Sequence, residues 1–397
     1  MEEFLNQTRI CFGEHALGYL KQYHSKRCFV VADPFLAKNG MLSQVTGYLG
    51  EAKVFDQVVP DPPLELVVAG IKELEAYEPQ ILVAVGGGSA IDAAKAIRHF
   101  GTRIAGKKGN NMSFIAIPTT SGTGSEVTSF SVITDKDKGV KYPLVDVAMR
   151  PDVAILDPEL VKSVPPAITA DTGMDVLTHG LEAYVSTKAT PFSDALAIWA
   201  IAAVFECLPR SYEGKGQEGT QGDGTAFKAL ASSPGTDWEQ ARARMHYASC
   251  MAGMAFDAAS LGLNHAIAHN IGGRFHIPHG RANAILLPYV VNFNAGSLEY
   301  NSKDCSDTAQ KYAKLARQLG FGGMNTRTSV KNLVNQIVKL QKQLSMPRKF
   351  MDCGVKPEEY HEAMEQLITG AQGDACILTN PREASGQDIA SILKQAL

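Results

Sequence analysis

The chain has 397 residues, which exceeds what one ordinary hydrophobic core needs and predicts two domains. Its apolar share of 45%, its charged share of 20% and its net charge of −3 are typical of a soluble globular protein, and they exclude a basic surface for nucleic acid or anionic lipid. The longest apolar runs, such as residues 284–291, are shorter than a membrane span requires. Neither a nucleic acid nor a membrane is therefore expected as a partner.

Up to about residue 158, short β-rich runs alternate with amphipathic segments. Buried parallel strands are predicted at residues 27–32, 81–85, 114–117 and 153–156. Residues 64–77 have helical spacing, with Leu66, Val67, Ile71 and Leu74 on one face. This alternation predicts an α/β domain with a parallel sheet over residues 1–158.

After Pro158 the pattern becomes helical. Long helices are predicted around residues 195–208, 241–259 and 328–344, and few strand patterns occur. We therefore expect an all-α domain over residues 159–397. Residues 212–234 are rich in Gly, Ser and Thr, which predicts a flexible surface loop.

Two loops of the first domain are suited to binding phosphate. The strand ending at Val85 leads into Gly86-Gly87-Gly88-Ser89 and then a helix, a geometry that points backbone N–H groups at an anion. A tight turn without a ligand explains this motif alone equally well. Residues 118–126, PTTSGTGSE, follow another strand and carry several hydroxyls. Both loops belong at the carboxyl edge of one sheet, which favours a nucleotide cofactor.

Asp33 comes directly after the strand at residues 27–32. A carboxylate there could accept hydrogen bonds from both hydroxyls of an adenosine ribose and would repel a 2′-phosphate, which favours NAD over NADP. An Asp at a turn also has ordinary structural reasons to be there.

Histidines cluster in the second domain. His265, His269, His276 and His279 fall in NHAIAHNIGGRFHIPHG. Asp175 and His179 are four residues apart, as are His265 and His269, so each pair leaves one face of a helix. A carboxylate with several imidazoles suits Fe²⁺ or Zn²⁺. Spacing alone does not select the metal ligands. The apolar neighbours Phe275 and Ile277 predict that His276 is a core or cap residue.

Four stretches together resemble the iron-containing (group III) alcohol dehydrogenases. They are GGGSAIDAAKAI, AIPTTSGTGSEVTS, DTGMDVLTHGLEAYVS and NHAIAHNIGGRFHIPHG, in the family's order. Within that family, KGVKYPLVDVAMRPDVAILDPELV and TNPR are most similar to propanol dehydrogenases of propanediol-utilisation microcompartments. The resemblance implies an α/β dinucleotide-binding domain followed by an all-α domain, the dehydroquinate synthase-like fold, with NAD(H) and Fe²⁺ (or Zn²⁺) as cofactors.

The resemblance also assigns residues to roles. The implied metal ligands are Asp175, His179, His265 and His279. His269 matches a non-ligand histidine near the nicotinamide, and we expect it to relay a proton. The implied cofactor contacts are Asp33, Gly87, Gly88, Ser89, Asp92, Thr119, Thr120, Val132 and Lys141. The implied substrate pocket is lined by Phe130, Phe256, Leu261 and Cys376.

The expected reaction is NAD(H)- and metal-dependent reduction of short-chain aldehydes such as propanal or acetaldehyde to primary alcohols, and its reverse. The alternatives are a related diol, lactaldehyde or glycerol dehydrogenase, or a dehydroquinate-synthase-like lyase. A lyase would need Lys and Arg around a phosphorylated substrate, and the segment 265–281 offers only Arg274 and Arg281.

Seven cysteines, odd in number and without a C-x-x-C pair, favour a reducing compartment. The N-terminus has Glu2 and Glu3 and no apolar signal segment, which favours the cytoplasm. The sequence begins without an added helical leader and so does not support packaging in a microcompartment. The family resemblance nevertheless keeps that association open. A homodimer or larger homo-oligomer is expected by analogy with relatives.

Overall fold

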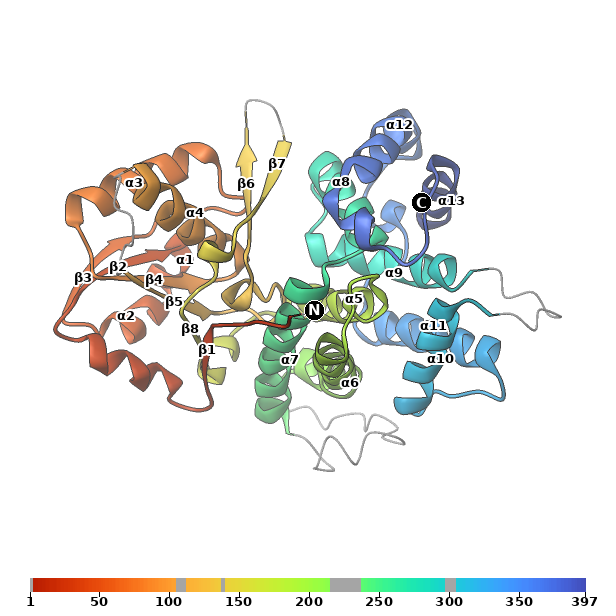
Figure 1. Cartoon of the computed structure of the whole chain (residues 1–397), viewed down its shortest axis with the longest axis horizontal. Helices are drawn as coiled ribbons and strands as arrows, with labels where there is room; N and C mark the ends of the chain where they lie inside the picture. Colours follow the sequence, from red (N-terminus) through yellow and green to blue (C-terminus); the bar gives the residue numbers. More distant parts are fainter. Residues whose placement is uncertain (1–2, 105–111, 137–139, 215–236, 297–304) are drawn as a thin grey trace. The chain divides into compact units, whose positions relative to one another are not determined.

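A computed structural model describes residues 3–104, 112–136, 140–214, 237–296 and 305–397. The chain forms two compact units, Met1–Val164 and Pro165–Leu397. The first is an α/β unit and the second is helical (Figure 1). Most of the predicted surface loop at 212–234 lies outside the described residues, and its first residues end a helix instead.

The N-terminal unit is built on a six-stranded parallel sheet. Its strand order is β1–β8–β5–β4–β2–β3. The central strands are continuous apolar runs because both faces of the sheet are covered. The strands are β1 (Arg9–Phe12), β2 (Arg27–Ala32), β3 (Glu51–Phe55), β4 (Ile81–Gly86), β5 (Ser113–Pro118) and β8 (Val153–Leu156).

Helices cover the two faces of this sheet. Helices α3 (Leu64–Tyr77) and α4 (Gly88–Ile104) pack on one face, where Ile71 and Ile97 join the same core as Phe29 of β2 (Figure 1). The short helices α1 (Pro34–Lys38) and α2 (Met41–Thr46) contribute to the core on the other face. The parallel order with crossover helices is the predicted one.

The strand order reverses between β2 and β4. From β2 the chain moves outward to β3, and it then returns past β2 to form β4, after which β5 and β8 continue in the opposite direction. In open α/β sheets, ligands bind at the carboxyl ends of the strands beside such a reversal. Asp33 follows β2 and the glycine loop follows β4, so both lie at this point.

A separate antiparallel ribbon, β6 (Phe130–Asp135) and β7 (Val140–Val145), was not predicted from the sequence. In β6, half-buried positions alternate with buried ones. Strand β7 contains Pro143, and a proline weakens the sequence pattern of a strand. Ile133 of β6 is buried in the core formed with α3 and α4.

The described part of the C-terminal unit contains helices and no strands. Its α-helices are α5 (Pro166–Val185), α6 (Pro191–Glu213), α7 (Trp238–Ala259), α8 (Leu263–Phe275), α9 (His279–Ala295), α10 (Asp307–Gln318), α11 (Thr326–Gln343), α12 (Pro357–Gly373) and α13 (Gly386–Ala396). Helix α5 packs against α6, α7 and α9. A second core joins α8, α9, α12 and α13. The predicted α/β plus helical fold class is confirmed.

Helix α6 is long and apolar enough to cross a membrane by length and composition, with a mean hydropathy of 1.5 in its most apolar window. This corrects the prediction that the longest apolar runs are shorter than a membrane span requires. Half of that window is buried, and the helix packs between α5 and α7. Glycines allow this packing, because a Cβ at Gly180 of α5 would lie 2.8 Å from Ile201 of α6. The contacts are those of a core helix.

Candidate active site

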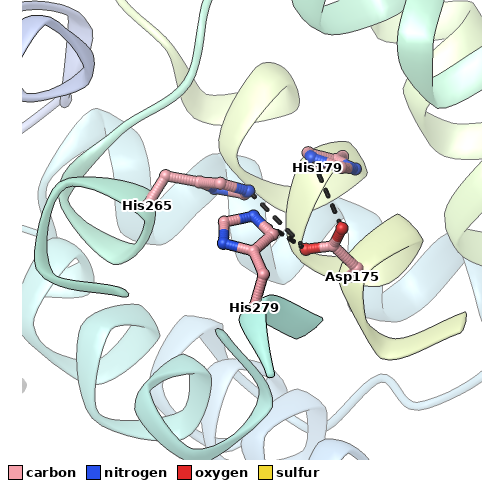
Figure 2. A group of neighbouring side chains, drawn as sticks. All are labelled: Asp175, His179, His265 and His279. Carbon is pink, nitrogen blue, oxygen red and sulfur yellow. Dashed lines mark ion pairs between the residues drawn. The ribbon is translucent and has the colours of Figure 1, made fainter. Parts of the chain in front are cut away.

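Four side chains from three helices converge in the C-terminal unit. Asp175 and His179 come from α5, His265 comes from α8 and His279 begins α9 (Figure 2). One ligand atom from each lies within 4.8 Å of the others. The Nε2 atoms of His179, His265 and His279 are 3.9, 3.8 and 3.5 Å from carboxylate oxygens of Asp175.

The helical spacing explains the first pair, since residues four apart share one face of α5. The close approach of α9 to α5 explains how His279 joins them. Gly280 has no side chain, and a Cβ there would overlap the carbonyl oxygen of Asp171. Arg281 then forms a bidentate ion pair with Asp171, at 3.1 and 2.9 Å, which fixes the start of α9 against α5. His279 is thereby held as the first residue of α9.

The donor set fits a divalent first-row metal. A tetrahedral Fe²⁺ or Zn²⁺ site with bonds of about 2.1 Å separates its ligand atoms by roughly 3.4 Å, close to the spacings here. The Nδ2 atom of Asn283 lies 2.7 Å from Asp175 Oδ1 and 3.1 Å from Nε2 of both His265 and His279. Several acceptor atoms thus point at one small space, which a cation would satisfy better than one amide group.

The electrostatics of the cluster also call for positive charge. Burial alone would raise the pKa of Asp175, but His179, His279 and His265 outweigh it and hold that pKa well below its usual range. Burial lowers the pKa of His265, yet the carboxylates of Glu182 and Asp175 overcome this and raise it to about 9. The two carboxylates on either side of His265 therefore favour a positive charge between them, either a proton on the imidazole or a metal ion bound to it.

His269 lies beside this cluster and has a carboxylate partner that the sequence reading missed. Its ring stacks on His279 with centroids 5.3 Å apart, and its Nδ1 is 2.8 Å from Oδ2 of Asp374. Burial would raise the pKa of Asp374, but hydrogen bonds from His269 and from the backbone N–H of Cys376 bring it to about 2. Asp374 is therefore ionised and accepts the Nδ1 proton of His269.

Three of the four predicted pocket residues belong to this unit. Phe256 stacks on His179 with ring centroids 4.5 Å apart, and Leu261 is buried. Cys376 is buried within reach of His269 and Asp374, and burial raises the pKa of its thiol, so it is a neutral group. Phe130 belongs to β6 of the N-terminal unit and is half-buried. His276 ends α8 as its C-cap and lies outside the metal cluster.

The two predicted phosphate loops are in contact in the N-terminal unit. Thr119 donates its backbone N–H to the carbonyl of Gly86 at 3.0 Å. A Cβ at Gly87 would lie 3.3 Å from Thr120 Oγ1, and one at Gly88 would lie 2.8 Å from Thr123. A side chain at position 88 would therefore displace Thr123, and one at position 87 would press on Thr120, so the two glycines let the loops approach closely. Ser89 follows in the first turn of α4, so the loops form one surface that ends at a helix N-terminus.

The carboxylate of Asp92 stabilises the conformation of these loops. Its Oδ1 accepts from Ser125 Oγ at 2.6 Å, and its Oδ2 accepts from the backbone N–H of Val132 at 3.0 Å. Lys95, one turn later on α4, is fully buried and donates to Ser125, Thr128 and the carbonyl of Phe130. This network joins α4 to the hydroxyl loop and to β6.

Asp33 has both a structural contact and a suitable position. Its Oδ1 caps α1 by accepting from the N–H groups of Phe35 and Leu36. Its Oδ2 lies 3.5 Å from where a Cβ of Gly86 would be, so this oxygen faces the glycine loop. Lys141 is paired with Thr134 in the ribbon of β6 and β7.

Sequence and structure comparisons agree with this geometry. The profile "Iron-containing alcohol dehydrogenase" matches residues 7–158, and "Fe-containing alcohol dehydrogenase family, C-terminal" matches residues 169–231 and 225–397. The 1-propanol dehydrogenase PduQ of Salmonella typhimurium is 43% identical over 403 residues, covering 100% of both chains.

Solved structures show the same fold. The iron-containing alcohol dehydrogenase of Thermococcus thioreducens has a TM-score of 0.85 and 34% identity, covering 99% of each chain. The sulfoacetaldehyde reductase of Bifidobacterium kashiwanohense, in complex with NAD⁺, has a TM-score of 0.81 and 26% identity, covering 100% of this chain and 98% of its own. Iron and NAD are thus cofactors of the group, as expected from the sequence. The chain belongs to the iron-containing alcohol dehydrogenase family and is an oxidoreductase of that family.

Proposed function

We propose that the protein reduces short-chain aldehydes such as propanal and acetaldehyde to primary alcohols with NADH, and catalyses the reverse reaction. Asp175, His179, His265 and His279 would hold one divalent metal ion, Fe²⁺ or Zn²⁺. The observation that carries the proposal is the convergence of these four ligand atoms within 4.8 Å. When bound, the metal supplies Lewis acidity at the substrate oxygen and the dinucleotide exchanges a hydride with the substrate carbon.

His269 is the proposed proton relay. Its Nδ1 is held by ionised Asp374, so Nε2 is the ring atom that can take up or release a proton. Its ring stacks on that of His279, which keeps it beside the proposed metal ligands. A histidine so placed could move a proton between the reacting oxygen and solvent without serving as a ligand.

The cofactor is proposed to bind at the strand-order reversal of the N-terminal unit. Its proposed contacts are Asp33, Gly87, Gly88, Ser89, Asp92, Thr119, Thr120, Val132 and Lys141. Gly87 and Gly88 let the backbone approach a pyrophosphate, while Asp92 acts by holding the loops. The Asp33 oxygen that faces the glycine loop supports a preference for NAD over NADP.

The proposed substrates have about two to four carbons. Phe256 and Leu261 are apolar and Phe256 lies against His179, which favours an unbranched alkyl chain over a diol or an acid. Cys376 completes the proposed lining in this unit, and the role of Phe130 rests on the family resemblance alone. The full-length similarity to a 1-propanol dehydrogenase supports propanal as the first substrate to test.

The deciding experiment follows NADH oxidation with propanal after anaerobic purification and loading with Fe²⁺ or Zn²⁺. We expect consumption of NADH that requires added metal and is lost with a chelator. NADPH and glycerol, 1,2-propanediol and lactaldehyde are run in parallel. Faster turnover of glycerol or propanediol would replace this proposal with a polyol dehydrogenase.

A dehydroquinate-synthase-like lyase is the other candidate. It would need cationic side chains for a phosphorylated substrate, but Arg281 is already paired with Asp171. Bound NADH without any net oxidation by the aldehydes tested would favour that alternative.

The assembly and its location remain predictions. We expect a homodimer or a larger homo-oligomer in the cytoplasm, with microcompartment association open. Light scattering on the purified protein measures the first, and fractionation of cells tests the second.

A further inference from the structure

Glu182 is a buried carboxylate whose two oxygens have different partners. It lies on α5 and is 4% exposed. Its Oε1 accepts from the backbone N–H of Asn264 at 2.6 Å, and its Oε2 is 2.5 Å from Nδ1 of His265. A single side chain thus contacts both the beginning of α8 and the histidine that α8 contributes to the metal cluster.

The start of α8 depends on acceptors from elsewhere in the chain. Its N-cap, Gly262, has no side chain to accept a hydrogen bond. Glu182 accepts from Asn264, and Asn380 Oδ1 accepts from Leu263 at 3.1 Å. A Cβ at Gly262 would lie 2.9 Å from both of these oxygens, so the glycine leaves room for them. These two side chains provide the capping that the N-cap residue lacks.

The hydrogen bonds of Glu182 also set the state of His265. Because Oε1 accepts from a backbone N–H, the side chain is oriented with Oε2 toward Nδ1 of His265. A metal-binding His265 must keep the lone pair on Nε2, which faces Asp175, and must therefore carry its proton on Nδ1. A carboxylate at Nδ1 accepts that proton in a hydrogen bond and makes the imidazole a stronger ligand.

We propose that Glu182 is the positioning residue of the metal centre: it holds His265 in the Nδ1–H tautomer with Nε2 directed at the metal, and so sets the affinity for metal. This inference rests on the proposed function, because it takes His265 as a ligand. Glu182 itself contributes no atom to the cluster of four ligands.

The substitution Glu182→Gln tests it with almost no change of shape. An amide has one oxygen and one NH₂ group, so it cannot accept from both Asn264 and His265. If its oxygen stays with Asn264, its NH₂ faces Nδ1 and drives the proton of His265 to Nε2, where it blocks the metal. We expect a 10- to 100-fold loss of affinity for Co²⁺ or Zn²⁺, measured in the full chain by competition with a chelator.

The visible absorption of the Co²⁺ form gives a readout besides activity. Loss or reorientation of one imidazole should shift and weaken the d–d bands of the variant. Asn380→Leu is the matched control, since it removes the other acceptor at the start of α8 but touches no proposed ligand. We expect that variant to unfold at a lower temperature while keeping Co²⁺ affinity within about twofold and an unchanged spectrum.

Two results would overturn the inference. One is wild-type affinity and spectrum in Glu182→Gln, and the other is an equal loss of affinity in both variants, which would make helix capping the cause. If Glu182→Gln does not fold, the wild-type Zn²⁺ form labelled with ¹⁵N-histidine decides, because an Nδ1 proton of His265 without the downfield shift of a hydrogen bond to a carboxylate contradicts the proposal. Failure of the wild-type chain to bind Co²⁺ or Zn²⁺ would instead contradict the proposed metal site.

Discussion

Each of the two units contains a buried polar cluster, and the two clusters differ in how their buried charge is compensated. In the N-terminal unit, Lys95 is fully buried and its ammonium donates to Ser125 Oγ at 2.9 Å, Thr128 Oγ1 at 3.1 Å and the carbonyl of Phe130 at 2.6 Å. An ammonium has three protons, so the protein itself supplies an acceptor for each. The charge of Lys95 is therefore compensated by the protein itself, without a ligand.

In the C-terminal unit the balance is reversed. Asp175 is buried among three imidazoles, and Glu182 adds a second carboxylate behind His265. The acceptor atoms that converge there exceed the donors of Asn283, the amide that reaches them. This cluster becomes balanced when a cation is added. The comparison predicts that removing charge damages stability in the first cluster and metal binding in the second.

The largest effect is expected from Asp175→Asn. The substitution keeps the shape of the side chain but removes the anionic ligand, so the metal loses its neutralising partner. We expect less than about a tenth of the wild-type metal content, and a fall in aldehyde reduction on the order of 1,000-fold, equivalent to about 4 kcal/mol of Lewis-acid stabilisation. Metal analysis and steady-state kinetics measure both.

The same variant distinguishes a metal site from a structural ion cluster. Added metal should raise the melting temperature of the wild-type chain and leave that of Asp175→Asn unchanged, because only a species that binds the folded state stabilises it. A variant that keeps full metal content, or a wild-type chain whose melting temperature ignores metal, would contradict the proposed ligand set.

The reciprocal change is Lys95→Met in the N-terminal cluster. It leaves buried acceptors without their donor and Asp92 without a nearby cation, so we expect the free energy of unfolding to fall by about 2–4 kcal/mol. Binding of NADH should weaken because Lys95 joins α4 to the hydroxyl loop. Metal content should stay at the wild-type level.

Urea unfolding, metal analysis and NADH titration measure these three quantities. Lys72→Met is the matched control, since Lys72 lies exposed on α3, and its effect should stay within about 0.5 kcal/mol. If Lys95→Met lost metal but kept its stability, the distinction between the two clusters would be wrong.

The sequence predicted the elements that local pattern determines. The apolar runs at residues 27–32 and 153–156 are β2 and β8, and the helical spacing at 64–77 is α3 with the same bounds. The two strands are continuous buried apolar runs, and α3 is buried on one face, which gives its apolar residues a helical period. The pattern failed for β1 and β3, the two edge strands of the sheet, and for the ribbon of β6 and β7, where burial is partial.

The site divides in the same way. The i, i+4 spacing of Asp175 and His179 is a local signal, and Glu182 follows His179 by three residues on the same helix, so its place on that face could have been read from the sequence. Asp374 has no such signal, because it is 105 residues from His269 and meets it only through tertiary packing. Likewise, the approach of α9 to α5 depends on Gly280, whose role is evident only once Asp171 is seen beside it.

The smallest effect is expected where the carboxylate acts through His269. Asp374 resembles Glu182: its Oδ1 accepts from the backbone N–H of Cys376 at 2.8 Å, while its Oδ2 accepts from Nδ1 of His269 at 2.8 Å. In Asp374→Asn the carbonyl oxygen should stay with Cys376, so the NH₂ group faces Nδ1 and puts the proton of His269 on Nε2. We expect kcat to fall about 10-fold with little change in KM for the aldehyde, and metal content to remain intact.

His269→Ala should lower kcat further, by about 100-fold, with metal retained. Because Asp374 is expected to act only through His269, the double variant should be no slower than His269→Ala alone, and the pH profile of kcat should shift in Asp374→Asn. Asp388→Asn is the control, since that carboxylate caps α13 through Ser385. Additive losses in the double variant would show that Asp374 does not act through His269. Loss of metal from His269→Ala would show that His269 belongs to the metal cluster and is not a proton relay.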